Sequence, residues 1–230
     1  MKMKKLILFL TILPSLLFIS CLGMKGRQYQ ESSLVMINSH EGVLFAKTSN
    51  GRLITFNGIE DYALGSFWVM NYSFNEENGT VPMGQVYIDR VILSGKAVEI
   101  ARKDIITAEA PHEKGMELTG LNIVSDQRLQ DYFNNHWYIE FGYKAKKEEA
   151  VSINFYQRSV EGNQFAIDMR VMRTNEPTAE DVLQSKSVML NLASIRSLFP
   201  EEENVSVIVY YYKEGKNEPE KVENRMIITR

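Results

Sequence analysis

Strict alternation of apolar and polar residues runs through the C-terminal half of the chain and limits its fold more than any other feature. Successive side chains of a β-strand point to opposite faces, so apolar residues at every second position line one face of a sheet. Such rows are Trp137, Ile139, Phe141 and Tyr143; Val151, Ile153 and Phe155; Phe165, Ile167, Met169 and Val171; Val188, Leu190 and Leu192; and Val205, Val207, Val209 and Tyr211. With strands near 121–124 and over 225–229, they predict an antiparallel sandwich of about seven strands.

The N-terminal half shows the same period in shorter segments. Alternation occurs over 34–37, 43–48, 52–56, 67–74 and 86–93, each bounded by turn residues. Asn50-Gly51 lies between the second and third segments and favours a type I′ hairpin turn, because this dipeptide tolerates positive φ. Five short strands in so few residues predict a small closed barrel.

The pattern weakens over 103–118, which contains Pro111 and many charges, and we place a domain boundary there. The predicted division is a leader at 1–20, a tether at 21–32, a barrel at 33–110 and a sandwich at 118–230. Helical spacing is limited to Leu129, Tyr132 and Phe133 and to a single turn over 192–198. The predicted fold class is therefore all-β.

The first 21 residues indicate export. Lys2, Lys4 and Lys5 precede an apolar stretch over 6–19, and Ser20 precedes Cys21, the only cysteine of the 230 residues. Fourteen helical residues reach about 21 Å, less than the roughly 30 Å of a bilayer core, so this segment is a signal peptide. Residues 17–21 resemble the lipobox of bacterial lipoproteins, although Phe18 replaces the usual Leu or Val. The resemblance implies lipidation at Cys21; the alternative is a secreted protein with a leftover cysteine.

Charge and motif content exclude several functions. Removing the three leader lysines leaves 23 basic against 29 acidic residues, and an acidic exported protein is a poor nucleic-acid binder. The histidines His40, His112 and His136 show no metal-ligand spacing, and no nucleophile elbow, phosphate-binding loop or calcium loop occurs. We therefore expect no catalytic residue, no metal site and no cofactor. A pair of carboxylates assembled only in space, as in glycosidases, stays open as an alternative.

Aromatic residues supply the candidate interaction surface. Trp68 and Trp137 share strand faces with apolar neighbours and are predicted to be core residues. Tyr138, Tyr156, Tyr210 and Tyr212, with Ile208, fall on the opposite faces of the C-terminal strands. The four tyrosines are therefore expected to lie together, either as cross-strand pairs within a solvated sheet or as a contact surface.

The lipobox, the short-stranded unit with its Asn50-Gly51-Arg52 hairpin, and the C-terminal sandwich together resemble the NigD-like lipoproteins of Bacteroidetes. The resemblance implies an N-terminal OB-fold domain and a C-terminal immunoglobulin-like β-sandwich. It also implies an activity related to bacteriocin immunity, although a fold does not transfer a role by itself.

The expected function is that of a non-catalytic lipoprotein of the bacterial envelope. Its partners would be the membrane, through the lipid on Cys21, and an envelope protein, peptide or glycan; nucleic acid is not expected. The residues after Cys21 carry no acids, which favours an outer-membrane anchor that faces the periplasm. The alternative is an envelope hydrolase or a carbohydrate-binding accessory protein.

Overall fold

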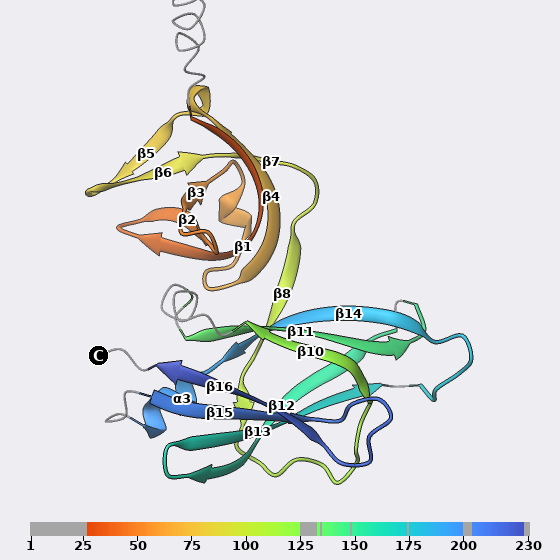
Figure 1. Cartoon of the computed structure of the whole chain (residues 1–230). Helices are drawn as coiled ribbons and strands as arrows, with labels where there is room; N and C mark the ends of the chain where they lie inside the picture. The colour runs from red at the N-terminus through yellow and green to blue at the C-terminus, as the bar shows by residue number, and fades with distance from the viewer. Residues whose placement is uncertain are drawn as a thin grey trace, which may run out of the picture.

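The computed structural model describes residues 27–124, 133, 135–147, 149–173, 175–199 and 204–227. Within these ranges sixteen strands account for nearly all regular structure, together with one α-helix and two short 3-10 helices. The prediction of an all-β fold is confirmed. Figure 1 shows two β units, one above the other, joined by strand β8. None of the helices in the described part of the chain has the length and apolar run needed to cross a bilayer.

The N-terminal half, residues 27–97, is a curled sheet. Its elements are β1 (Gln28–His40), β2 (Val43–Thr48), β3 (Leu53–Thr55), η1 (Ile59–Asp61), β4 (Phe67–Asn75), η2 (Glu76–Asn78), β5 (Thr80–Met83), β6 (Val86–Arg90) and β7 (Ile92–Leu93). β1 pairs with both β2 and β4, and the sheet continues from β2 through β3 and β6 to β5.

The expected closed barrel is wrong, because no pairing among the described strands joins β5 to β4 or β7. β5 contains Pro82, which has no N–H to donate to a further strand, so it suits an edge. The sheet instead stays open and curls around a core that includes Val35, Ile37, Ile54, Met70 and Tyr72.

The predicted type I′ turn at Asn50-Gly51 is wrong, and a turn of this kind lies instead between β1 and β2. Glu41 and Gly42, between β1 and β2, both have positive φ, as that turn requires. In the hairpin between β2 and β3 only Gly51 has positive φ, and its N–H donates to the Thr48 carbonyl. Asn50 therefore needs no unusual backbone angle, and its side chain donates instead to Glu31.

Strand β8 (Val98–Lys103) joins the two halves through main-chain pairing. Its first residues pair antiparallel with β4, and its last residues pair parallel with β14 (Val182–Asn191). A buried cluster surrounds this crossing and contains Met36, Phe67, Ile100, Phe133 and Met189, which come from both halves. Shared hydrogen bonding and a shared core therefore hold the halves together.

The C-terminal sandwich is the unit formed by the strands that follow β8. One layer contains β10 (Leu118–Val124), β11 (His136–Ala145) and β14, and β8 extends it. The other layer runs in the order β16 (Glu220–Ile227), β15 (Asn204–Tyr211), β13 (Gln164–Arg173), β12 (Val151–Glu161) and β9 (Ile105–Ile106). Seven of these strands lie within the described residues from Leu118 to Ile227, as predicted. The core between the layers includes all five predicted apolar rows.

The sandwich is mixed rather than antiparallel as expected, since β13 and β15 pair parallel. Parallel neighbours need a crossover connection, and here the chain passes through β14 in the other layer and the helix α3 (Ala193–Leu198) before it returns as β15. The predicted helical turn over 192–198 therefore forms part of this crossover. Leu129 and Tyr132 of the other helical prediction lie outside the described residues.

Two of the predicted domain boundaries differ from the observed strands. β1 begins at Gln28, within the segment assigned to the tether. β9 pairs with β12 of the sandwich, although its residues fall within the segment 33–110 assigned to the barrel. Over 107–117 the described chain has no strand or helix.

Candidate functional site

The two outer faces of the sandwich differ in what covers them. The face of β10, β11 and β14 lies toward the N-terminal half, and the face of β12, β13 and β15 points away from it (Figure 1). Tyr138 belongs to the first face, where it packs against the junction cluster and shares a hydrogen bond with Ser187 of 2.7 Å. The structure therefore separates Tyr138 from the other three predicted tyrosines.

Tyr156 and Tyr210 lie on the second face, on either side of the central strand β13. The cross-strand register places Tyr156 opposite Asp168 and Asp168 opposite Tyr210, so the three form one transverse row. Lys221 of the edge strand β16 continues the row beyond Tyr210. Tyr212 follows β15, two residues after Tyr210. Two of the four predicted tyrosines are thus in one row, and a third is beside it.

Two arginines stack on these tyrosines. The Arg158 Cζ atom lies 4.3 Å from the Tyr210 ring centroid, and the Arg170 Cζ atom lies 4.9 Å from that of Tyr212. Lys114 also contacts the Tyr212 ring, at 5.0 Å. We call Tyr156, Arg158, Asp168, Arg170, Tyr210 and Tyr212 the Tyr–Arg face. Such cation–π contacts each contribute about 0.5–1 kcal/mol at exposed sites and more where water is excluded.

Asp168 connects the two arginines. Its Oδ1 atom lies 3.1 Å from Arg158 Nη1 and 3.5 Å from Arg170 Nη1. Asp168 and Arg170 are 7% and 8% exposed, which is low for charged residues on the outer face of a two-layer sandwich. Ala166 and Ile208 on the same face are also buried. Both faces of the central strand β13 are therefore covered. The contacts of Arg158 and Tyr212 show that long side chains of the neighbouring strands help to cover its outer face.

The charge of this face is opposite to that of the whole chain. Arg158 and Arg170 outnumber Asp168, and on β16 the residues Lys221 and Arg225 flank Glu223 in the same orientation. With Glu161, which the register places opposite Gln164 in the same orientation, the face carries four basic and three acidic residues, whereas the chain has a formal charge of −3. Sequence analysis missed the arginines, although Asp168 and Arg170 share the alternation that identified the tyrosines.

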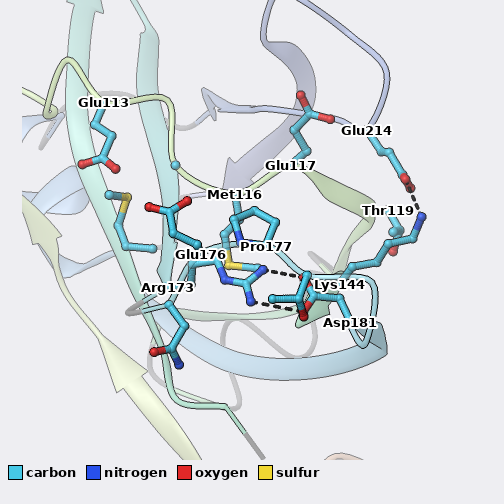
Figure 2. A pocket seen from close by; sticks show the side chains of 14 residues that line it. Glu113, Met116, Glu117, Thr119, Lys144, Arg173, Glu176, Pro177, Asp181 and Glu214 are labelled. Atoms are coloured by element: carbon cyan, nitrogen blue, oxygen red, sulfur yellow. Dashed lines mark hydrogen bonds and ion pairs between the residues drawn. The ribbon is translucent and has the colours of Figure 1, made fainter. Parts of the chain in front are cut away.

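A cleft at the edge of the sandwich has a volume of about 590 Å³. The segment 113–119, the end of β13, the loop 175–181 and Glu214 form its walls (Figure 2). Its acidic residues are Glu113, Glu117, Glu176, Asp181 and Glu214. This is the site that the hydrolase alternative would use.

Three of those five acids are in ion pairs. Arg173 binds Asp181, Lys144 binds Glu214, and Lys114 binds Glu117 with an Nζ–Oε1 distance of 2.7 Å; Figure 2 shows the first two pairs. The hydrogen bond from Lys114 lowers the pKa of Glu117, and that from Arg173 lowers the pKa of Asp181. A general acid needs a raised pKa, so these two carboxyls are unsuited to that role.

The largely buried side chain of Arg173 forms the floor of the cleft. Its Nη1 atom lies 2.7 Å from Asp181 Oδ2, and its Nη2 atom lies 2.7 Å from Oε2 of Glu149, which is 2% exposed in its side chain. Burial raises the pKa of Glu149, but hydrogen bonds from the Lys146 N–H and from Arg173 outweigh it and lower the pKa overall. This network joins β13 to two loops, and no pattern in the sequence indicates it.

The described residues contain no group of three or more His, Cys, Asp and Glu side chains that could hold a metal ion. His136 Nδ1 lies 2.8 Å from the Phe133 carbonyl oxygen, within the junction between the halves. Cys21, the predicted lipidation site, lies outside the described residues.

Replacing Gly115 by alanine tests how closely the cleft wall approaches β13. Gly115 has φ +73°, and an added Cβ would lie 2.8 Å from the Val171 carbonyl oxygen, a backbone atom that cannot rotate away. We expect Gly115→Ala to lower the free energy of unfolding by about 2–3 kcal/mol. The matched control is Gly162→Ala, since Gly162 has φ +56° and nothing within 4 Å; it should cost only about 1 kcal/mol. Equal losses in urea denaturation would show that the wall is loose.

Comparisons with known proteins support the fold. No protein-family model matches the chain, and no curated protein matches it in sequence. The chain is similar to a candidate lipoprotein from Bacteroides fragilis, with a TM-score of 0.60 and 13% identity over 86% of this chain and 98% of that chain. It is also similar to a candidate toxin-related protein from Parabacteroides distasonis, with a TM-score of 0.58 and 13% identity over 86% and 94%.

A NigD-like immunity protein from Bacteroides caccae is similar as well, with a TM-score of 0.52 and 10% identity over 86% of this chain and 97% of that chain. At these identities the likeness concerns the fold. It extends over most of each chain, so the resemblance to NigD-like lipoproteins is confirmed at that level.

Proposed function

We propose that this chain, which shares its fold with lipoprotein-like and immunity-like proteins of Bacteroides, is a non-catalytic binding module anchored to the bacterial envelope through a lipid on Cys21. The observation that carries the binding role is the Tyr–Arg face, where tyrosines and arginines cover the central strand on the side away from the N-terminal half. Tyr and Arg are enriched at protein interfaces because they give a large contact area and several hydrogen bonds.

The leader pattern and the candidate lipoprotein among the structural neighbours support an anchored envelope protein. We further propose the outer membrane as the site and the periplasm as the compartment, because acids are absent directly after Cys21. An immunity role is proposed from the NigD-like neighbour alone. It would consist of sequestering a toxic protein rather than cleaving it.

The hydrolase alternative is less favoured because three of the five acids of the cleft form ion pairs, with Lys114, Lys144 and Arg173. A carbohydrate-binding role would use an exposed indole ring to stack on sugar C–H groups. Trp137 is fully buried in the sandwich core, and Trp68 packs against the N-terminal core with its Nε1 bonded to Ser66. Neither indole is placed for such stacking.

The anchor is tested on the mature N-terminus. We expect mass spectrometry to find Cys21 as the first residue, carrying diacylglycerol and an N-acyl chain, since two or more chains are needed for stable membrane attachment. Cys21→Ala should move the protein from the detergent phase to the aqueous phase. An unmodified terminus at another residue, or unchanged partitioning of the variant, would contradict the anchor.

The binding role is tested by replacing Tyr210 and Tyr212 together with serine. Loss of three cation–π contacts should cost about 1.5–3 kcal/mol of stability, leaving the protein folded. Recovery of the envelope partner that crosslinks to the wild-type protein in cells should fall to background. Tyr87→Ser is the matched control, because Tyr87 is 70% exposed on the N-terminal half. Equal recovery by the folded double variant would remove this face from consideration.

A further inference from the structure

The three central charges of the Tyr–Arg face do not balance. Arg158, Asp168 and Arg170 together carry one excess positive charge, and Asp168 is the carboxylate within ion-pair distance of both arginines. Arg170 has a side chain that is only 9% exposed, and its Nε atom makes no hydrogen bond to any described atom. A buried cation that is underpaired costs free energy, and a second carboxylate nearby would offset that cost.

Arg158 is placed to bind that second carboxylate. Its side chain is 43% exposed, so the guanidinium is accessible from solvent. One N–H donates to Asp168 and its plane lies over the Tyr210 ring, which together fix its position. Arginine has five N–H donors, and a guanidinium held in this way loses little entropy when it binds a carboxylate.

The surrounding face favours a protein partner over a small ligand. Tyr156 and Tyr210 lie on the strands on either side of β13, and Tyr212 follows β15, so the three aromatic rings are spread over the face of a sheet. Lys221 and Arg225 extend the positive charge toward β16. Charge complementarity of this kind selects an acidic surface and speeds its association.

We infer that the Tyr–Arg face binds an acidic segment of a partner protein, with the exposed Arg158 receiving an Asp or Glu carboxylate next to the buried Arg170 and the tyrosines packing beside it. The inference rests on the proposed function, since it assigns the chemistry of the partner that this face would bind. Asp168 acts as an internal competitor, because it occupies donors that the incoming carboxylate would use.

The test measures binding of the folded mature protein, without its lipid, to poly-L-glutamate at low ionic strength. We expect saturable binding that weakens with salt. Arg158→Gln should weaken the binding of poly-L-glutamate about tenfold, because a loss of this size corresponds to one charge-assisted hydrogen bond. Arg90→Gln is the matched control, because Arg90 is an exposed arginine on the N-terminal half, and its affinity should match that of the wild type.

Asp168→Asn should change the affinity in the direction opposite to Arg158→Gln. This variant therefore distinguishes a role of Asp168 in binding from a purely structural role. It should bind poly-L-glutamate several-fold more tightly, because it frees both guanidinium groups. A purely structural role for Asp168 predicts lower stability with unchanged or weaker binding. No binding of poly-L-glutamate, equal effects of Arg158→Gln and Arg90→Gln, or a preference for polygalacturonate, an anionic glycan, would each overturn the inference.

The outcome also distinguishes this inference from the proposed function. If the double serine variant loses its envelope partner while Arg158→Gln retains it in full, the face binds a partner that is not acidic. If the double serine variant also retains the partner, the proposed function fails at this face.

Discussion

Replacing Arg173 by leucine is expected to lower the melting temperature by about 10 °C at neutral pH, because it leaves two enclosed carboxylates without a cationic partner. Arg173 donates two hydrogen bonds to Glu149 and two to Asp181. All three side chains are at most 11% exposed. Lys144→Met is the matched control, since Lys144 pairs with Glu214 but both are about half exposed. An exposed pair of that kind contributes little.

The effect of Arg173→Leu should depend on pH in a defined direction. The pKa values of Glu149 and Asp181 are lowered in the folded protein, so their contribution is complete above the ordinary pKa of each carboxyl. It is lost as pH falls through the lowered pKa values. In the variant those carboxyls become easier to protonate, so the gap in melting temperature between wild type and variant should narrow toward pH 4.

Adding Glu149→Gln and Asp181→Asn to Arg173→Leu should restore much of the stability at neutral pH, because the uncompensated charges are removed. A gap that is unchanged by pH, and no recovery in the triple variant, would show that Arg173 acts through packing alone.

The second large effect is expected at Phe67, in the junction between the halves. Its ring is 1% exposed and meets Phe133 edge-on at a centroid distance of 5.8 Å. Phe67→Ala should lower the free energy of unfolding by about 3–5 kcal/mol, because it opens a cavity in a shared core. The two halves should then unfold in separate calorimetric transitions, whereas the wild type should show one.

Phe56→Ala provides the control for Phe67→Ala. Phe56 is buried in the core of the N-terminal half and does not belong to the junction cluster. Its replacement should destabilise that half without abolishing the cooperativity caused by the shared core. A single transition in Phe67→Ala, merely shifted to lower temperature, would show that pairing through β8 is sufficient to couple the halves.

The sandwich core could be predicted because its residues follow a single local rule. Every residue of the five apolar rows, from Trp137 to Tyr211, is part of one buried cluster. In each row the side chain positions follow from the period of two, which requires no knowledge of the partner strand. The parallel pairing of β13 with β15 was not predictable in this way, because it depends on a crossover through another layer.

Strand β8, which joins the two halves, was not predicted, for a different reason. β8 contains the alternation of Val98 and Ile100, but its strand identity depends on two sheets that are distant in sequence. Similarly, alternation correctly placed Tyr138 away from the sandwich core, but it could not show that the N-terminal half covers that face. Period determines which face a residue is on, and only the tertiary structure determines what that face contacts.

The direction of β1 has a consequence for orientation at a membrane. Gln28 begins the strand, and Met36, eight residues later, belongs to the junction cluster, so β1 begins up to about 27 Å along the strand from the junction, at the end of the N-terminal half away from the sandwich (Figure 1). Arg27 is six positions after Cys21, a span of at most about 21 Å. If Cys21 carries a lipid, the N-terminal half must therefore lie next to the bilayer, between the membrane and the sandwich. The Tyr–Arg face, on the remote side of the sandwich (Figure 1), would then be held out into the aqueous compartment, beyond the reach of lipid headgroups.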